Sequence, residues 1–241
     1  MRFVLYNIRY GTGGGKIHFP LSGYVGRSGK TLDEIGDFLH ELDPDVVGLV
    51  EVDAGSYRTR KLNQAEILAK KLGHYHVYRS KYGKESWTHR VPVFNQQGNA
   101  FVVRDSGHRE TFHYFEKGMK QLVIELDLGD VAFFLLHLPL NSRLRHRQLR
   151  ELYEMLQMMK KPYIVAGDFN TLWGEQEVQL FQAATKLESA QAAHSPTFPS
   201  WKPKRHLDFV FHSPGIEIDK CWMPQVLYSD HLPIVCDFHV V

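Results

Sequence analysis

The stretch YIVAGDFNTL, residues 163–172, joins a buried-strand pattern to polar side chains that a strand does not need. The apolar run passes Gly167, and Asp168 and Asn170 follow with Phe169 between them. Side chains two positions apart on a strand share a face and lie roughly 7 Å apart. The stability of the fold alone does not explain why a carboxylate and an amide share one face at the end of this strand. The stretch therefore indicates a functional site at the end of a strand.

Composition and charge are those of an ordinary globular protein. The chain has 241 residues, 43% hydrophobic and 23% charged, and we expect one domain over residues 1–241 that acts as a monomer. The 29 basic and 27 acidic side chains leave a net charge of +2, which does not by itself indicate a nucleic acid or an acidic membrane as partner.

The first residues, MRFVLYNIRYG, contain Asn7 and Arg9 within the apolar run, so they predict neither a signal peptide nor a transmembrane segment. We expect a cytoplasmic protein. Cys221 and Cys236 are the only cysteines, which excludes a cysteine-based zinc site. Their apolar surroundings favour buried, reduced thiols over a disulfide.

Nine strand-like runs alternate with three helical patterns. The strands are predicted at 2–10, 45–53, 74–80, 99–104, 120–128, 131–140, 163–170, 206–212 and 232–241, and the helices at 31–42, 63–73 and 142–161. Thr31, with Glu34 three residues later, is the predicted cap of the first helix. The Gly-Asp turn in LDLGDVAFF, residues 126–134, predicts an antiparallel hairpin, so the sheets should be mixed. The predicted class is α/β or α+β, and two packed sheets with helices outside accommodate this many strands best.

Polar residues follow most of these apolar runs. They are Asn7, Glu51, His137, Asp168, Asn170 and Asp208, while Asp230 and His231 open the last strand. Carboxylates and amides with histidines, but without cysteine, suit Mg²⁺ or Mn²⁺. Hydrolysis of a phosphoester needs a cation on the phosphoryl oxygens, a group that orients water, and donors for developing negative charge. The set fits that chemistry.

Six ordered motifs resemble those of the endonuclease/exonuclease/phosphatase superfamily, which has the fold of deoxyribonuclease I, exonuclease III, inositol polyphosphate 5-phosphatases and neutral sphingomyelinases. The motifs are YNIRYG (6–11), DPDVVGLVEVD (43–53), HLPL (137–140), AGDFNT (166–171), HLDFVF (206–211) and SDHLPIV (229–235). The resemblance implies a four-layer α/β sandwich in which two packed mixed sheets are flanked by helices.

The resemblance also implies roles for single residues. Glu51 would be the direct ligand of Mg²⁺ or Mn²⁺, with Asn7 and Asp230 supporting the metal. Asp168 would position or activate the attacking water, and Asn170 would bind the phosphate. His231, oriented by Asp208, would contact the scissile phosphate, and His137 stands where the deoxyribonuclease I branch also has a histidine.

Two departures bear on the substrate. Val52 follows Glu51, and His206 and Leu207 precede Asp208, whereas abasic-site nucleases usually have a lysine and an arginine near these places. The pattern looks more like bacterial proteins known only as metal-dependent hydrolases. Two further residues are candidate substrate contacts. Arg58 lies in the segment after Glu51, and the alternative for it is a role within that loop. Asn99 is an amide in an apolar strand, and the alternative for it is a bulge or edge position.

Arg143, Arg147 and Arg150 fall on one helical face that either steers phosphates or is simply solvated. Three functions follow in order of preference. The first is a metal-dependent phosphodiesterase or phosphatase acting on a small molecule or headgroup rather than duplex DNA. The second is an Mg²⁺-dependent endo- or exonuclease on DNA or RNA, and the third is a non-catalytic phosphate-binding member of the fold.

Overall fold

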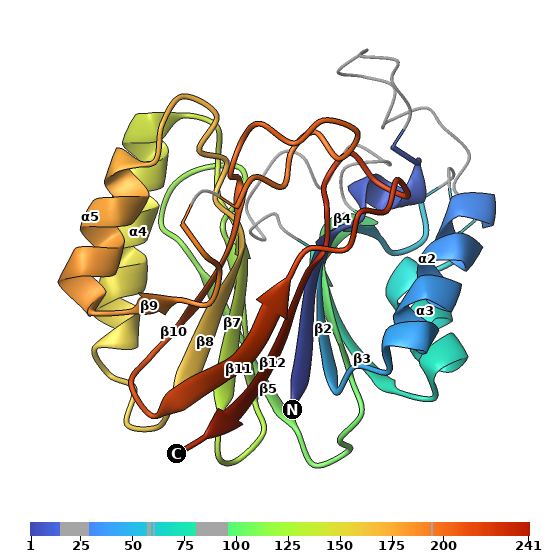
Figure 1. Ribbon diagram of the computed structural model, residues 1–241, viewed down its shortest axis with the longest axis horizontal. Coiled ribbons are helices and arrows are strands. Elements are labelled where there is room, and N and C mark those ends of the chain that lie inside the picture. Colours follow the sequence, from blue (N-terminus) through green and yellow to red (C-terminus); the bar gives the residue numbers. More distant parts are fainter. Residues whose placement is uncertain (15–28, 57–58, 60, 81–95, 194) are drawn as a thin grey trace.

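Two six-stranded sheets pack face to face and carry helices on their outer faces (Figure 1). The computed structural model describes residues 1–14, 29–56, 59, 61–80, 96–193 and 195–241. The first sheet has the order β11-β12-β1-β2-β4-β3 and the second β5-β6-β7-β8-β10-β9. Their bounds are β1 Arg2–Asn7, β2 Val46–Asp53, β3 Tyr75–Ser80, β4 Gln97–Val103, β5 Arg109–Tyr114, β6 Leu122–Asp127, β7 Ala132–His137, β8 Tyr163–Asp168, β9 Glu188–Ser189, β10 Asp208–His212, β11 Ile216–Trp222 and β12 Ile234–Val240.

Three layers of apolar side chains hold the sandwich together. Phe3, Phe101 and Phe133 pack between the sheets, and Phe133 contacts both other rings at centroid distances of 5.3 and 6.3 Å. The helices α2 (Gly29–Leu42) and α3 (Gln64–Leu72) cover the first sheet, and α4 (Ser142–Leu156) and α5 (Gln176–Thr185) cover the second. Strands such as β7 are buried on both faces, which explains their uninterrupted apolar sequence.

Strand pairing brings the predicted polar residues to one edge. β1 pairs parallel with β2, and β7 pairs parallel with β8, so within each sheet two carboxyl ends lie side by side. β10 starts at this edge and runs antiparallel to β8. Ligand sites of α/β sheets commonly lie at such carboxyl ends.

The four-layer architecture, the mixed sheets and the 126–134 hairpin are confirmed, the hairpin as β6 and β7. The sequence pattern did not reveal β5, β9 or β11, which are all edge strands. Edge strands expose one side and tolerate polar residues, so their apolar signal is weak. It also missed α5, whose sequence QEVQLFQAAT buries only Val178 and Phe181.

Two helix boundaries differ from the prediction. Thr31 does not cap α2, because the helix already begins at Gly29, and Glu34 instead lies 3.7 Å from Lys30 across one helical turn. The helix α4 ends at Leu156 rather than at residue 161. At α3, Asn63 is the N-cap and accepts from the Ala65 amide, and Gly73 closes the helix in the left-handed conformation. None of the described helices is long and apolar enough to cross a bilayer.

Candidate active site

Asp168 is the centre of the candidate site, because its strand has a polar neighbour on each side. In the sheet register His137 lies opposite Asp168 on β7, and Asp208 lies opposite it on β10. All three side chains are almost fully buried. The glycine before Asp168 is required by close packing, since a Cβ at Gly167 would lie 2.0 Å from the Leu136 carbonyl oxygen. The sequence Gly-Asp therefore lets β8 approach β7 closely where the carboxylate emerges.

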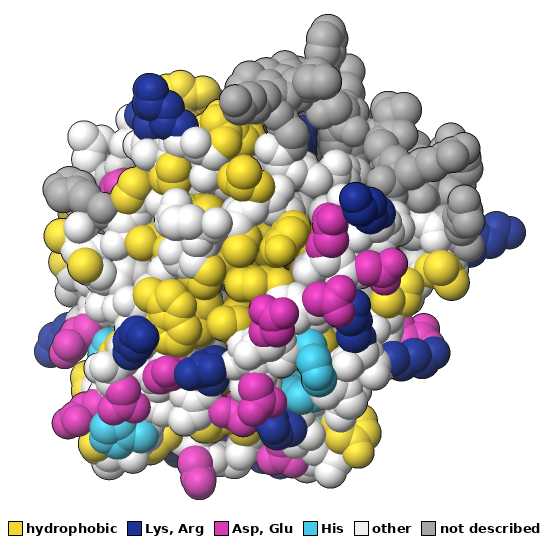
Figure 2. All heavy atoms as spheres, turned by 45° about the vertical axis from the view of Figure 1, so that its right-hand side comes forward, with side chains coloured by type: hydrophobic (Ala, Val, Ile, Leu, Met, Phe, Trp, Pro, Cys, Tyr) yellow, Lys and Arg dark blue, Asp and Glu magenta, His cyan; other side chains and the backbone are white. Residues whose placement is uncertain are grey.

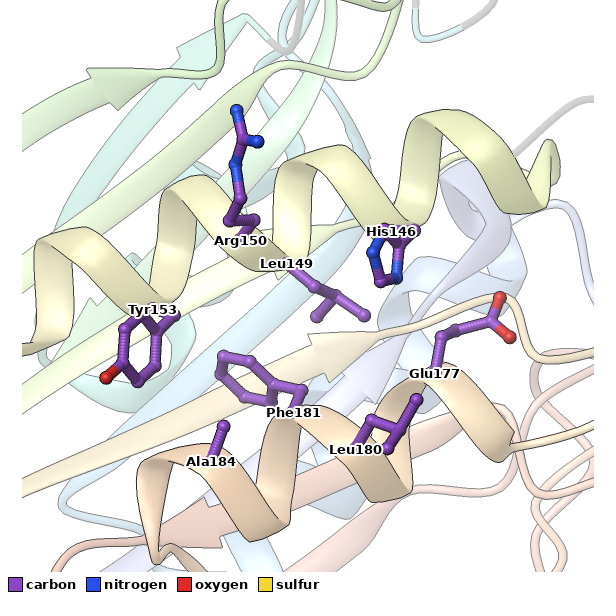
Figure 3. A pocket seen from close by; sticks show the side chains of 8 residues that line it. All are labelled: His146, Leu149, Arg150, Tyr153, Glu177, Leu180, Phe181 and Ala184. Carbon is purple, nitrogen blue, oxygen red and sulfur yellow. The ribbon is translucent and has the colours of Figure 1, made fainter.

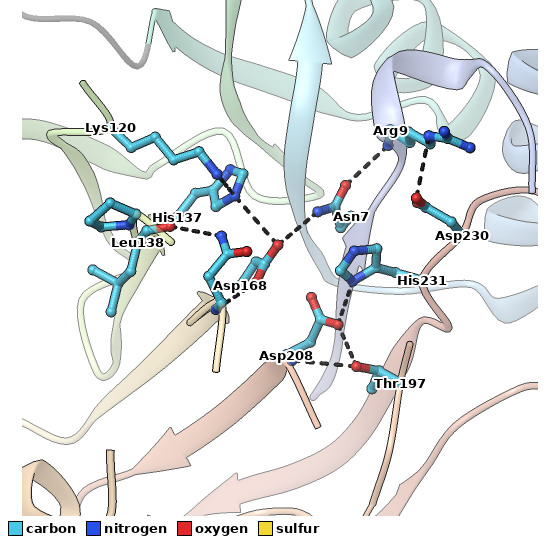
Figure 4. Close-up of polar contacts among 12 residues, drawn as sticks. Asn7, Arg9, Lys120, His137, Leu138, Asp168, Thr197, Asp208, Asp230 and His231 are labelled. Atoms are coloured by element: carbon cyan, nitrogen blue, oxygen red, sulfur yellow. Dashed lines mark hydrogen bonds and ion pairs between the residues drawn. The ribbon is translucent and has the colours of Figure 1, made fainter. Parts of the chain in front are cut away.

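Hydrogen bonds fix both oxygens of the Asp168 carboxylate (Figure 4). Asn7 Nδ2 donates to Oδ2 at 3.1 Å from the other sheet, and the Asn170 backbone N–H donates to Oδ1 at 2.9 Å. His137 Nε2 lies 3.4 Å from Oδ2. Asn170 adopts a left-handed conformation with φ 53°, and its side-chain amide donates to the Leu138 carbonyl at 2.8 Å. Burial raises the pKa of Asp168 to about 7, and the nearby Asp208 carboxylate adds to this shift.

His231 and Asp208 form a buried pair beside Asp168. His231 Nδ1 lies 2.7 Å from Asp208 Oδ2, and the same oxygen accepts a hydrogen bond from the Thr197 hydroxyl at 2.5 Å. The Phe198 ring packs on the imidazole with a centroid distance of 5.0 Å, so it borders this site. Burial alone would lower the pKa of His231, but the Asp208 carboxylate overrides it and raises the pKa to about 10.

Glu51 reaches the same region through a β-bulge. Leu49 lies opposite Ala100 and Val52 opposite Gly98, so β2 carries one extra residue against β4. Glu51 has a φ of 57°, a left-handed conformation that costs a non-glycine residue roughly 1–2 kcal/mol. Bulges commonly re-aim a side chain next to an active site. Burial raises the pKa of Asp230 and the Glu51 charge adds to that shift, and the same charge opposes the lowering of the Lys120 pKa by burial, so the Glu51 carboxylate lies near both groups.

Asn7 and Asp230 lie on the Glu51 side of the site. Asn7 Oδ1 accepts from the Arg9 backbone N–H at 3.1 Å, and the Ser229 hydroxyl donates to the Asn7 carbonyl at 2.7 Å. Arg9 Nε lies 3.3 Å from Asp230 Oδ2. Burial raises the pKa of Asp230, which marks a carboxylate whose surroundings do not fully stabilise its charge. A bound cation would supply that stabilisation.

The structure brings one set of possible metal ligands together, and the sequence predicts a second, separate set. Ligand atoms of Asp168, Asp208 and His231 lie within 4.8 Å of one another. His231 Nδ1 is already engaged by Asp208 Oδ2 at 2.7 Å, and a metal at that nitrogen would have to replace this contact. The oxygen donors Glu51, Asn7 and Asp230 suit a hard divalent cation better. The predicted metal ligands thus remain the preferred set.

Of the two candidate substrate contacts, Arg58 and Asn99, the structure describes only Asn99. Arg58 lies outside the described residues. Asn99 lies opposite the β2 bulge and is fully buried, and neither amide atom has a hydrogen-bond partner in the described part of the chain. It shares its strand face with Phe101, which packs between the sheets, so its amide faces the inner side of the sandwich.

Two neighbours of the site carried no sequence signal. Lys120, in the turn before β6, contacts His137 Nε2 with its ammonium group. Burial lowers the pKa of Lys120, while the charges of Glu51 and Asp168 oppose that shift. A lysine in a short polar turn looks like a surface residue in sequence. Thr197 likewise gives no pattern that would link it to Asp208.

Arg145 fastens the loops that carry the site. Its side chain is buried, and Nη1 donates to the carbonyls of Pro139 at 3.1 Å, Leu140 at 3.1 Å and Asn170 at 2.9 Å. Its Nε donates to Glu177 Oε1 of α5 at 2.6 Å. One side chain therefore ties α4 and α5 to the segments that follow β7 and β8.

A separate cavity of about 340 Å³ lies between α4 and α5 (Figure 3). Its lining residues are His146, Leu149, Arg150, Tyr153, Glu177, Leu180, Phe181 and Ala184, and none of them belongs to the polar cluster around Asp168. This cavity therefore lies apart from the candidate active site.

Comparison with known proteins assigns the family. The model of the Endonuclease/Exonuclease/phosphatase family matches residues 4–231. The chain belongs to this family. Its members are phosphatases and nucleases and generally depend on a divalent metal. A curated relative, the UPF0294 protein VV2535 of Vibrio vulnificus, is 34% identical over 96 residues, 38% of this chain and 32% of the relative, so the match spans about a third of that protein.

Solved structures support the fold at low sequence identity. A functionally unknown conserved protein of Enterococcus faecalis matches with a TM-score of 0.75, 15% identity and full coverage of both chains. The mannosyl-6-phosphatase Bt3783 of Bacteroides thetaiotaomicron matches with a TM-score of 0.68, 16% identity and 99% coverage of both. The human Nocturnin catalytic domain, solved with a bound sulfate anion, gives 0.67 and 20% identity, with 100% of this chain and 94% of that chain covered.

Replacing Arg145 by Met should lower the free energy of unfolding by roughly 3–5 kcal/mol, because it leaves three carbonyls and the partly buried Glu177 carboxylate without their donor. Urea unfolding measures the loss. Arg143→Met, which removes an exposed arginine from the same helix, is the matched control and should change stability little. Equal losses in the two variants would contradict the bracing role.

The His231–Asp208 contact predicts a pH dependence in protein freed of metal by a chelator. A histidine with a raised pKa adds stability that is fully present below its unfolded value of about 6.5. That stability is lost as the pH rises through about 10. Asp208→Asn should lower the pKa, and an NMR titration of the His231 ring proton would show it. An unchanged titration in the variant would rule out the electrostatic cause.

Proposed function

We propose that the protein is a divalent-metal-dependent hydrolase of phosphoesters, with a small phosphodiester or a phosphorylated headgroup as substrate. The observation that carries the proposal is the arrangement around Asp168. A buried carboxylate with a raised pKa lies between the metal-type donors Asn7, Glu51 and Asp230 and the His231–Asp208 pair, in which Asp208 comes from β10 and His231 from the segment before β12. A purely structural role would not require so many ionisable groups to share one buried edge.

The metal would be held by Glu51 with Asn7 and Asp230, and when bound it polarises the phosphoryl oxygens. Asp168, fixed by Asn7 and by the Asn170 N–H, orients the attacking water and accepts its proton. Protonated His231 stabilises the negative charge that develops on the phosphoryl oxygens. Asn170 shapes the phosphate site from the loop after β8.

Lys120 and His137 lie on the side of Asp168 away from Asp208, since β7 and β10 flank β8. Together they hold a transferable proton between an ammonium group and an imidazole nitrogen. We assign this pair to the leaving-group oxygen, which takes up that proton as its bond to phosphorus breaks. In this arrangement water activation and leaving-group protonation belong to different residues.

The preference for a compact substrate rests on charge. Net charge is +2, and the face in Figure 2 intersperses acidic and basic side chains around a hydrophobic area. That face presents no continuous basic surface among its described residues. Duplex DNA binding needs neutralisation of several phosphates along an extended surface. A small phosphoester does not.

Hydrolysis should require Mg²⁺ or Mn²⁺ and should stop in the presence of a chelator, because the donor set contains oxygen and nitrogen but no thiolate. The measurement is turnover of a chromogenic phosphodiester in stripped protein, before and after each metal is added back. Glu51→Gln should raise the metal concentration needed for half-maximal activity. Full turnover without metal would refute the proposal.

Asp168→Asn and Lys120→Met should both lower kcat, by roughly 10²-fold or more, since each removes one proton-transfer group. Their dependence on the leaving group should differ. Lys120→Met should slow alkyl esters much more than nitrophenyl esters, because nitrophenolate needs no proton to depart. Asp168→Asn should slow both classes alike. The assigned roles fail if the two variants show the same leaving-group dependence.

Salt dependence should distinguish a compact substrate from a nucleic acid. For a small phosphodiester, KM should rise only modestly with salt, whereas duplex binding weakens with a logarithmic slope of about −0.9 per phosphate contacted. Double-stranded DNA, single-stranded DNA and small diesters are compared at several salt concentrations. Efficient cleavage of long duplexes with a steep slope, and no turnover of small esters, would establish a nuclease instead.

A further inference from the structure

A polar cleft lies on the exposed face of α4, against the turn that precedes β6. It encloses about 400 Å³, and its lining contrasts with the largely apolar cavity between α4 and α5. Four lysine or arginine side chains and one carboxylate contribute to it. The lining residues are Glu116, Lys117, Arg143, His146, Arg147 and Arg150.

The cations of this cleft are poorly neutralised by the protein itself. Lys117, Arg143 and Arg147 form no ion pair with any carboxylate in the described part of the chain, and Arg150 lies 3.8 Å from Glu154. The Glu151 carboxylate lies one turn after Arg147, but it accepts a hydrogen bond from the Glu116 backbone N–H at 2.8 Å. The cleft therefore has a net positive charge and donors available for an anion.

The stability of α4 does not explain why Arg143 and Arg147 occupy their positions. Arg143 and Arg147 are four residues apart, and like charges at that spacing destabilise a helix. Arg143 also lies in the first turn of α4, where the positive end of the helix dipole disfavours cations and no acidic residue is present. Side chains that oppose local stability are expected where function requires them.

The cleft is joined to the active site through one short turn. Gln148, fully buried on α4, donates from Nε2 to the carbonyls of Lys117 and Lys120, each at 2.8 Å. Lys117 lines the cleft, while Lys120 contacts His137 in the active site. On the buried side of the same helix, Arg145 binds the Asn170 carbonyl. A ligand held in the cleft is thus held by elements that also position the catalytic groups.

We propose that this basic cleft binds a second phosphate of the substrate, so that the preferred substrate is a compact phosphoester with a further phosphate group. The inference rests on the proposed function. Guanidinium groups form paired hydrogen bonds to phosphate oxygens, and three arginines with a lysine suit that ligand. The non-scissile phosphate anchors the molecule on α4, while the scissile phosphate lies at Asp168 and His231.

The test uses matched pairs of substrates with the same scissile bond. One pair is the 5′-(p-nitrophenyl phosphate) of thymidine with and without a 3′-phosphate, and the other replaces the nucleoside by a propanediol chain. The ratio of kcat/KM values within each pair reports binding of the second phosphate. It should favour the doubly phosphorylated member by about tenfold or more, which corresponds to 1.4 kcal/mol. An advantage confined to the thymidine pair would assign the second phosphate to a nucleotide.

Arg143→Gln combined with Arg147→Gln should reduce that ratio to near one. The control variant is Lys30→Gln with Lys70→Gln, which changes net charge equally at exposed positions of α2 and α3 and should keep the wild-type ratio. A ratio near one in the wild type overturns the proposal. So does a ratio that falls equally in both variants, because the effect would then be one of general charge.

A binding measurement separates this proposal from the catalytic one. Calorimetric titration with inorganic pyrophosphate in the presence of a chelator should show binding that the double arginine variant loses and the double lysine variant retains. If no phosphoester is hydrolysed but this binding pattern holds, the hydrolase assignment fails and the anion site stands. If hydrolysis proceeds and pyrophosphate binding is identical in all three proteins, the cleft proposal fails alone.

Discussion

The structure depends on how one buried carboxylate, Asp168, is accommodated at the end of a central strand. Burial of a charge without partners is strongly unfavourable, and the surrounding elements supply those partners from both sheets. Asn7 donates from the first sheet, and the Asn170 N–H donates from the loop after β8. Burial nevertheless raises the pKa of Asp168 to about 7, and the nearby Asp208 carboxylate adds to this shift. The proposed role of Asp168 as a proton acceptor agrees with this direction.

Buried cations serve two different purposes around this carboxylate. The guanidinium group of Arg145 binds three carbonyls and Glu177, so this side chain makes the surrounding loops and helices rigid. Lys120 contacts an imidazole, and burial lowers its pKa, so its proton is easier to release than that of a surface lysine. The same type of residue thus acts as a brace or as a reactive group according to its partners, a distinction that a sequence alone does not carry.

The sequence predicted the parts of the structure that depend on strong local patterns. Apolar runs such as 131–140 are buried on both faces, and the polar residues that terminate them converge as expected because parallel strands end at one edge. Edge strands and α5 were missed because weak burial leaves no clear period. The Glu51 bulge and the approach of Lys120 to His137 depend on pairing between distant segments, so no local sequence pattern predicts them. Arg58 stays a prediction.

The division of the site between two sheets explains why the sandwich itself matters for chemistry. Asn7, Glu51 and Asp230 come from the first sheet and the segment before β12, whereas His137, Asp168 and Asp208 come from the second. Their separation is set by how closely the sheets pack, and that packing is tight. A Cβ at Gly48 would lie 3.1 Å from Leu135 Cδ1 across the interface. Because packed cores resist small displacements, the rings between the sheets hold the metal-type donors at a fixed distance from Asp168, and neither sheet alone contains both.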